Sequence, residues 1–221
     1  MRFELWEPIY QEILEDFGFS REKDEAAARL LQELMQEGSG TRPLEALEKL
    51  IRGKDVLVCG NAPRLAEELE KVRSSCDLGE MTVIAADGAT TCLLKKGVLP
   101  QVIVTDLDGY IPDVIAANKK GSFAVVHAHG DNMDALKKYV PKLIKMVGTT
   151  QSKPIGAIHN FGGFTDGDRC VFLARHFGAA EIKIIGFDYE DPNVTSMKKK
   201  KLKWARKLVE MALAPSFLTK D

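Results

Sequence analysis

The sequence predicts an α/β fold: a mostly parallel sheet flanked by helices, with an N-terminal helical segment in front of it. From residue 55 onward, short apolar runs rich in valine and isoleucine alternate with polar or glycine turns and with helical stretches. That alternation is typical of a parallel sheet, because successive parallel strands need a crossover helix between them. In the first 52 residues the apolar positions instead recur every three or four residues, which indicates helices.

The N-terminal segment, residues 1–52, predicts two helices that end near glycines. The first pattern stops before Gly18 and the second before Gly38, and Ser20 is placed to cap the second helix. The repeating apolar positions are Leu5, Ile9, Ile13 and Leu14, then Leu30, Leu31 and Leu34. These side chains exceed what two isolated helices can bury, so we expect the segment to form a homodimer interface or a lid.

Six apolar runs in the middle segment, residues 53–195, are the predicted strands of an α/β catalytic domain. They span residues 56–59, 83–86, 102–104, 123–126, 155–158 and 182–185. A polar or glycine-containing turn follows each run, and the carboxyl ends of parallel strands meet at one edge of the sheet. That edge is the expected ligand crevice, lined by helix N-termini that attract phosphate. A helical pattern returns in residues 196–221, the predicted C-terminal helix.

Two acids close the third predicted strand. Asp106 and Asp108 follow the run 102–104, and side chains two residues apart in an extended chain share a face. At about 4 Å two such charges repel by roughly 4 kcal/mol near a protein surface, so a cation is the natural compensation. Asp87 and Asp131 end neighbouring runs, and these oxygen ligands favour Mg²⁺ or Mn²⁺ over a structural zinc. We therefore expect magnesium bound together with phosphate oxygens.

Composition excludes several classes of function. The 221 residues carry a net charge of -1, so no bulk attraction to nucleic acid or membrane is expected. No run of apolar residues is long enough to span a bilayer, and the first residues lack the pattern of a secretion signal, so we expect a cytoplasmic protein. The P-loop, the Gly-x-Gly-x-x-Gly fingerprint, His-Glu-x-x-His and Gly-x-Ser-x-Gly do not occur, so a nucleotide is held by another arrangement.

Three short motifs follow one another at fixed spacing: Ala-Asp-Gly-Ala at 86–89, Gly-Val-Leu-Pro at 97–100 and Val-Thr-Asp-Leu-Asp-Gly at 104–109. Their order resembles that of thiamin pyrophosphokinases. His-Ala-His-Gly-Asp-Asn at 127–132 and Gly-Phe-Thr-Asp-Gly-Asp-Arg at 163–169 extend the likeness. With them the chain resembles the archaeal 6-hydroxymethyl-7,8-dihydropterin pyrophosphokinase family still more closely, over about residues 55–190.

The resemblance implies a fold like the thiamin pyrophosphokinase catalytic domain and an ATP-dependent diphosphotransferase. The pyrophosphoryl group of ATP would pass to the hydroxymethyl group of 6-hydroxymethyl-7,8-dihydropterin, releasing AMP, in folate- or methanopterin-type cofactor biosynthesis. Thiamin fits less well, since its kinases continue into a β-rich domain whereas residues 196–221 are helical in pattern. Mg²⁺ and ATP would suffice as co-reactants, because such catalysis is mostly positioning and electrostatics and needs no covalent nucleophile.

The motifs then supply candidate site residues. The expected catalytic residues are Asp106, Asp108 and Asp131, and the expected metal ligands are these three with Asp87. Residues expected to contact the nucleotide are Gly60, Asn61, Asp87, Gly88, His127, His129, Thr165, Asp166, Asp168 and Arg169. Those expected to contact the acceptor are Asn160, Phe161, Asp188 and Tyr189, because a carboxylate beside an aromatic ring suits the flat, N–H-bearing pterin.

Several motifs have a second interpretation. His127, His129 and Asp131 resemble the His-x-His-x-Asp of binuclear zinc hydrolases, yet only His159 and His176 remain to complete such a ligand set. Histidines of this kind also serve as plain core or turn residues. Thr165 with an acid three residues later resembles a helix capping box, and the turn 60–63 fits a structural proline turn.

The lysine run 198–201 also has two interpretations. Apolar residues repeat at helical spacing through it, which favours a solvated helix face, although folding over a bound triphosphate is the alternative. Other functions that share the acidic strand end stay open at this level. They are a thiamin pyrophosphokinase-like enzyme acting on another alcohol, a glycosyltransferase-like enzyme that holds a nucleotide diphosphate through Asp-x-Asp, and a nucleotide sensor without turnover.

Overall fold

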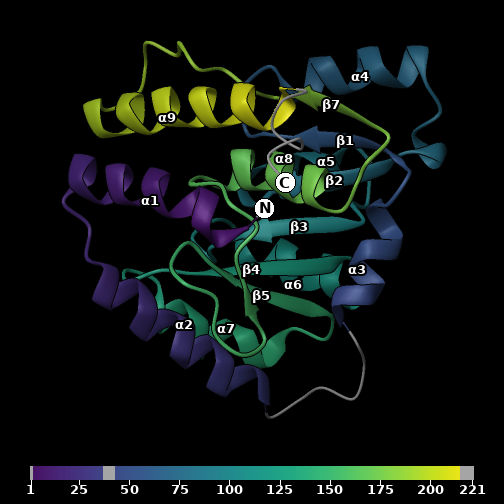
Figure 1. The fold of residues 1–221 in the computed structure, drawn as a ribbon. Coiled ribbons are helices and arrows are strands. Elements are labelled where there is room, and N and C mark those ends of the chain that lie inside the picture. The colour runs from purple at the N-terminus through teal and green to yellow at the C-terminus, as the bar shows by residue number, and fades with distance from the viewer. Residues whose placement is uncertain (1, 37–42, 215–221) are drawn as a thin grey trace.

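A computed structural model describes residues 2–36 and 43–214. Seven strands pair in parallel in the order β6-β5-β4-β3-β2-β1-β7 (Figure 1). The strands are β1 Asp55–Cys59, β2 Thr82–Ala86, β3 Val102–Thr105, β4 Phe123–Ala128, β5 Met146–Thr150, β6 Ile158–His159 and β7 Glu181–Ile185. The helices are α1 Phe3–Phe17, α2 Arg21–Gln36, α3 Pro43–Ile51, α4 Leu65–Ser75, α5 Thr90–Lys95, α6 Ile111–Lys119, α7 Met133–Tyr139, α8 Asp166–His176 and α9 Ser196–Leu213. The predicted fold class is confirmed.

The sheet has two covered faces because strand residues alternate between them. Val56 and Val58 of β1 pack with α1, α8 and α9, whereas Leu57 and Cys59 pack with α4 and α5. The chain runs from β1 to β6 in one direction across the sheet and then returns to place β7 beside β1. Right-handed crossovers put the helices of the outward run on one face and the returning helix α8 on the other.

One strand was missed and one was misplaced by the sequence pattern. β5 contains Gly148 and two threonines, so its composition is too polar for an apolar run, yet it pairs with β4 and β6. Gly148 lets α2 approach closely, since a Cβ there would meet Leu31 and Met35. The predicted strand 155–158 is instead a tight turn in which the backbone groups of Ile155 and Ile158 form hydrogen bonds with each other. Only Ile158 of this run belongs to β6.

The N-terminal helices pack on the sheet of their own chain. Trp6 and Tyr10 of α1 are 0% exposed, and the Trp6 indole N–H donates to the carbonyl of Gln151 at 2.8 Å. Ser20 caps α2 as predicted, accepting the N–H of Lys23 at 3.3 Å. The predicted end of that helix at Gly38 lies outside the described residues. The apolar faces that suggested a homodimer are thus buried internally, and the dimer stays a prediction.

The C-terminal helix α9 lies beside α1 (Figure 1). Lys200 Nζ is 2.8 Å from Asp16 Oδ1, the Trp204 indole donates to Asp16 at 2.7 Å, and Lys207 pairs with Glu12 at 3.2 Å. The predicted helix is confirmed over Ser196–Leu213, and residues 215–221 lie outside the described range. The division at residues 52 and 195 stays a prediction, since α1 and α9 share one core with the sheet. No helix in the described part of the chain has the length and apolar character needed to span a membrane.

Candidate functional site

Four aspartates gather at the carboxyl edge of the sheet. One carboxylate oxygen from each of Asp87, Asp106, Asp108 and Asp166 lies within 4.8 Å of the other three. They come from the end of β2, the turn after β3 and the first turn of α8. Asp131, predicted as a ligand, is exposed and outside this group, and Asp166 takes its place. We call these four residues the acidic cluster.

The turn after β3 brings Asp106 and Asp108 together by a route that the sequence did not predict. β3 ends at Thr105, and Leu107 has a φ of 67°, in the left-handed region that residues other than glycine rarely occupy. Such a residue costs roughly 1–3 kcal/mol and persists where its surroundings hold it. Here the Leu107 side chain is buried and its N–H donates to the Thr105 hydroxyl at 2.8 Å. The carboxylates therefore converge across a tight turn and not along an extended strand.

Asp87 is fixed by hydrogen bonds from that same turn. Its carboxylate accepts from the Thr105 hydroxyl and from the Gly109 N–H, the latter at 3.3 Å. A Cβ at residue 109 would collide with the Asp87 carboxylate, so only glycine allows this approach. The Asn61 side chain covers Gly88 in the same way, which places the turn after β1 at the border of the cluster.

Burial and mutual repulsion perturb the pKa values of the acidic cluster. Burial raises the pKa of Asp87, and burial together with the Asp106 charge raises the pKa of Asp108 to about 6. Burial and the Asp106 charge also raise the pKa of Asp166 well above its usual range. Burial is the largest single influence on Asp106 and opposes its ionisation, but the hydrogen bond with His129, the Arg169 charge and the hydrogen bond with Asp108 together outweigh it and lower that pKa. Such a set favours a bound cation.

The unsatisfied oxygens of the cluster fit a metal ion. Oδ1 of Asp87 and Oδ1 of Asp106 are buried, and neither has a hydrogen-bond partner among the described residues. Buried acceptors without partners are costly, so their retention points to a ligand. Oxygen donors in this number suit Mg²⁺ or Mn²⁺. The group consists of aspartates alone, which does not match the histidine-rich zinc site of the hydrolase interpretation.

The two histidines at the end of β4 have different surroundings. His127 is buried, and its Nδ1 lies 3.1 Å from the Thr149 hydroxyl. Burial lowers its pKa well below the usual value, so the ring is neutral at pH 7, and its Nε2 is without a partner among the described residues. His129 faces the cluster, with Nε2 3.5 Å from Asp106 Oδ2.

The start of α8 carries two carboxylates with different partners. Asp168 accepts the N–H of Thr165 at 3.0 Å and the Thr165 hydroxyl at 2.7 Å, so the capping-box interpretation is confirmed. Capping leaves Asp166 free to join the cluster, where Arg169 pairs with it at 3.1 Å. Arg169 Nη2 also lies 3.5 Å from the side-chain oxygen of Gln151.

The predicted acceptor residues separate into two places. Asn160 donates to the carbonyls of Gln151 and Ser152, and Phe161 packs on His176 at the far end of α8, an 11-residue helix about 16 Å long. The structure therefore does not bring Phe161 to the cluster.

Asp188 and Tyr189 lie in the turn after β7, closer to the acidic cluster. Asp188 pairs with Arg64 at 3.0 Å, and the buried Tyr189 hydroxyl has no partner in the described ranges. Contacts of the Phe187 ring place this turn against Gly60 and against Gly167 of the first turn of α8.

A buried network links the N-terminal helices to the site. The Asp24 carboxylate is 4% exposed and accepts from Gly130 N–H at 2.8 Å, from the Tyr10 hydroxyl at 2.8 Å and from Gln151 Nε2 at 2.7 Å. Gly130 sits so close to α2 that a Cβ would collide with Lys23. One signal was available in the sequence: Asp24 falls on the apolar stripe of its helix, followed at helical spacing by Ala27, Ala28 and Leu31, all buried.

Replacing Asp24 with asparagine is expected to cost roughly 2 kcal/mol in the free energy of unfolding, because an amide cannot accept from all three donors. The hydrogen bond to Gln151 can be restored if the Gln151 side-chain amide rotates so that its oxygen accepts from the new amide. That rotation removes the contact of the Gln151 oxygen with Arg169. We therefore also expect slower turnover. Chemical denaturation and steady-state rates measure both effects, with Glu25→Gln, the next residue of α2, as the control. Equal stability of D24N and E25Q would contradict the prediction.

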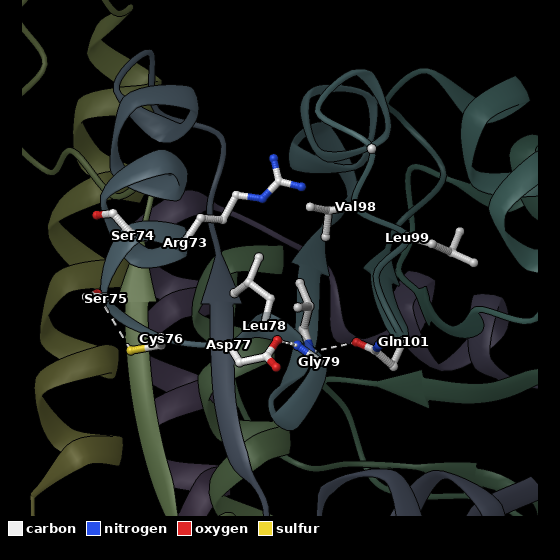
Figure 2. Close-up of a pocket in the computed structure, with 12 residues that line it drawn as sticks. Arg73, Ser74, Ser75, Cys76, Asp77, Leu78, Gly79, Val98, Leu99 and Gln101 are labelled. Carbon is white, nitrogen blue, oxygen red and sulfur yellow. Dashed lines mark hydrogen bonds between the residues drawn. The ribbon is translucent and has the colours of Figure 1, made fainter.

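A surface pocket lies at the opposite ends of the strands. It has a volume of about 740 Å³ and lies between the end of α4 and the residues that precede β3 (Figure 2). Val83 at the beginning of β2 and Gln101 before β3 line it, so it faces the amino ends of these strands. The acidic cluster is at the carboxyl ends. This cavity is therefore separate from the site.

Clustered carboxylates at the carboxyl edge of a parallel sheet are typical of α/β enzymes that act on phosphate-bearing substrates with a divalent cation. Residues 28–194 match the family described as "6-hydroxymethylpterin diphosphokinase MptE-like". The chain belongs to this family, which confirms the resemblance expected from its motifs.

Three archaeal proteins named 6-hydroxymethyl-7,8-dihydropterin pyrophosphokinase are similar over 95% of this chain. Those from Methanothermobacter thermautotrophicus and Pyrococcus furiosus are each 43% identical, with 94% of each relative covered. The protein from Methanocaldococcus jannaschii is 38% identical, with 95% covered.

Among solved structures, the MAf glycosyltransferase from Magnetospirillum magneticum AMB-1 resembles this chain with a TM-score of 0.53. The match covers 90% of this chain but only 35% of that longer protein, at 14% sequence identity. At this identity the likeness shows a shared fold alone.

Proposed function

We propose that this chain transfers the diphosphoryl group of ATP to the hydroxymethyl group of 6-hydroxymethyl-7,8-dihydropterin. The alcohol oxygen would attack the β-phosphorus and release its proton to solvent, the bond from that phosphorus to the α–β bridging oxygen would break, and AMP would leave. The three archaeal relatives are named for this activity, and they are similar to this chain over nearly its whole length. The single structural observation that supports it is the acidic cluster at the carboxyl edge of the sheet.

The cluster residues would hold magnesium. Asp87 and Asp106 each offer a buried carboxylate oxygen without a partner among the described residues, and Asp108 and Asp166 complete the set. A bound Mg²⁺ would neutralise charge on the phosphate oxygens. Arg169 would supply further positive charge beside Asp166, and the neutral His127 can donate or accept one hydrogen bond without adding charge.

The test incubates the purified protein with Mg²⁺, ATP and 6-hydroxymethyl-7,8-dihydropterin and follows the products by phosphorus NMR and chromatography. Thiamin, no acceptor, and a nucleotide-diphosphate sugar in place of ATP are the controls. AMP and a pterin diphosphate are the expected products, lost with EDTA and restored with Mg²⁺. AMP with thiamin only would correct the acceptor, and no cleavage of ATP would contradict the proposal. Transfer of the sugar would contradict the proposal and favour the glycosyltransferase alternative.

The turn after β7 is our proposed acceptor site. The Asp188 carboxylate can accept paired N–H groups of a pterin, and the Phe187 ring beside Gly167 borders the first turn of α8. Asp188→Asn is expected to raise the apparent KM for the pterin by roughly tenfold, since a charge-assisted hydrogen bond is lost, with little change in kcat. Arg64→Met, which removes the partner of Asp188, is the matched variant. An unchanged KM in D188N would remove the assignment.

A further inference from the structure

The lysine run of α9 is divided by the structure. Lys200 pairs with Asp16 of α1, and Lys198 and Lys199 are exposed. Lys201 instead lines a groove of about 210 Å³ that it shares with Arg169 and with the carboxylates of Asp106 and Asp131. Its Nζ lies 6.0 Å from the Phe164 ring centroid. Lys201 therefore faces the site, whereas its neighbours in the run do not. Both interpretations of the sequence had treated the four lysines alike.

A second lysine reaches the same groove from the other end of the chain. Lys23 in the first turn of α2 lines the groove together with the α1–α2 corner at Gly18–Ser20. Lys23 and Lys201 both lie outside residues 28–194, the segment matched by the family. Two of the three lysine and arginine side chains of the groove thus come from helices that flank the matched segment, and they offset the charges of Asp106 and Asp131.

Arg169 gives an independent sign of a missing anion. It is 7% exposed and lines the groove, with one nitrogen paired to Asp166 and another near Gln151. Its Nε is buried with no acceptor among the described residues. A buried charged donor without an acceptor is costly, so the groove offers a site for an anionic oxygen.

We infer that Lys23, Arg169 and Lys201 form a subsite for the polyphosphate chain of a nucleoside triphosphate, beside the acidic cluster. The inference rests on the proposed function, which brings a triphosphate to this edge. A divalent cation on the aspartates can neutralise only part of that chain. Lysine and arginine are the side chains that bind the remaining phosphate oxygens, as point charges and as planar donors.

The test compares Lys201→Met and Lys23→Met with Lys199→Met, an exposed lysine of the same run. Isothermal titration measures the dissociation constants of ATP with Mg²⁺, of inorganic tripolyphosphate and of AMP at several salt concentrations. We expect roughly tenfold weaker binding of ATP and tripolyphosphate in each of the first two variants, with a shallower salt dependence, and normal binding in K199M. AMP binding should change little, because AMP lacks the β- and γ-phosphates. Lys201→Arg, which keeps the charge, should bind ATP nearly normally.

The outcomes separate this inference from the proposed function. If K201M and K23M bind ATP and tripolyphosphate as tightly as K199M does, the subsite is wrong whatever reaction the protein catalyses. If the wild-type protein binds ATP through these lysines but forms no AMP with the pterin, the proposed function fails and the subsite stands. Equal weakening of AMP and ATP binding in K201M would indicate a general distortion of the groove and would also overturn the subsite.

Discussion

Asp106→Asn and Asp108→Asn should each lower the rate of AMP formation by about a thousandfold, as expected for removal of a preorganised electrostatic group. The cluster would hold the cation through these oxygens, and an amide is a weaker, uncharged ligand. Initial rates at saturating ATP and pterin measure the loss. The control is Asp134→Asn, an exposed aspartate in the first turn of α7, which should keep normal turnover.

The free energy of unfolding should not fall along with the activity of these two variants. Asp108 has its pKa raised by burial and by the Asp106 charge, so neutralising it removes repulsion, and D108N should gain about 1 kcal/mol in the free energy of unfolding at pH 7. D106N loses the interaction with His129 as well as the repulsion, so its stability should stay within about 1 kcal/mol of the wild type. Near-normal turnover in either variant would show that the central site is misassigned.

Asp166→Asn should lower turnover by roughly a hundredfold, whereas Asp131→Asn should lower it by less than tenfold. The reason is position: Asp166 lies within the acidic cluster and pairs with Arg169, while Asp131 is exposed and outside it. The variants also differ in a readout that does not depend on activity. Binding of Mn²⁺, followed by its electron paramagnetic resonance signal, should weaken in D166N and persist in D131N. The reverse order would restore the ligand set predicted from the sequence.

Most of the sheet could be predicted because its strands are locally encoded. β1, β2, β3 and β4 are almost wholly buried and read as continuous apolar runs, whereas the edge strand β7 is only partly buried but keeps three isoleucines. β5 could not be found this way, since its glycine and threonines have weak apolar character. This segment is a strand because it pairs with β4 on one side and β6 on the other. The run 155–158 has the composition of a strand, but the positive φ of Gly156 at 53° reverses the chain within it.

The members of the acidic cluster could be predicted only where they follow strands. Asp87, Asp106 and Asp108 were found because acids at the carboxyl ends of parallel strands must meet at one edge. From the sequence, Asp131 was expected as a ligand and Asp166 only as a nucleotide contact. Only the packing of α8 against the sheet decides that Asp166 reaches the cluster. The left-handed backbone conformation of Leu107 likewise could not be predicted from the sequence, since leucine has no preference for it.

The sequence by itself determined the α/β class, the family and the acidic strand ends, because these depend on residues close together in the chain and on the fixed geometry of parallel strands. Only the tertiary structure decided that Asp24, Lys23 and Lys201 belong to the site region. Their segments are separated from the strands by long stretches of chain, and local patterns carry no information about such contacts. Burial of α1, α2 and α9 against one sheet brings them together.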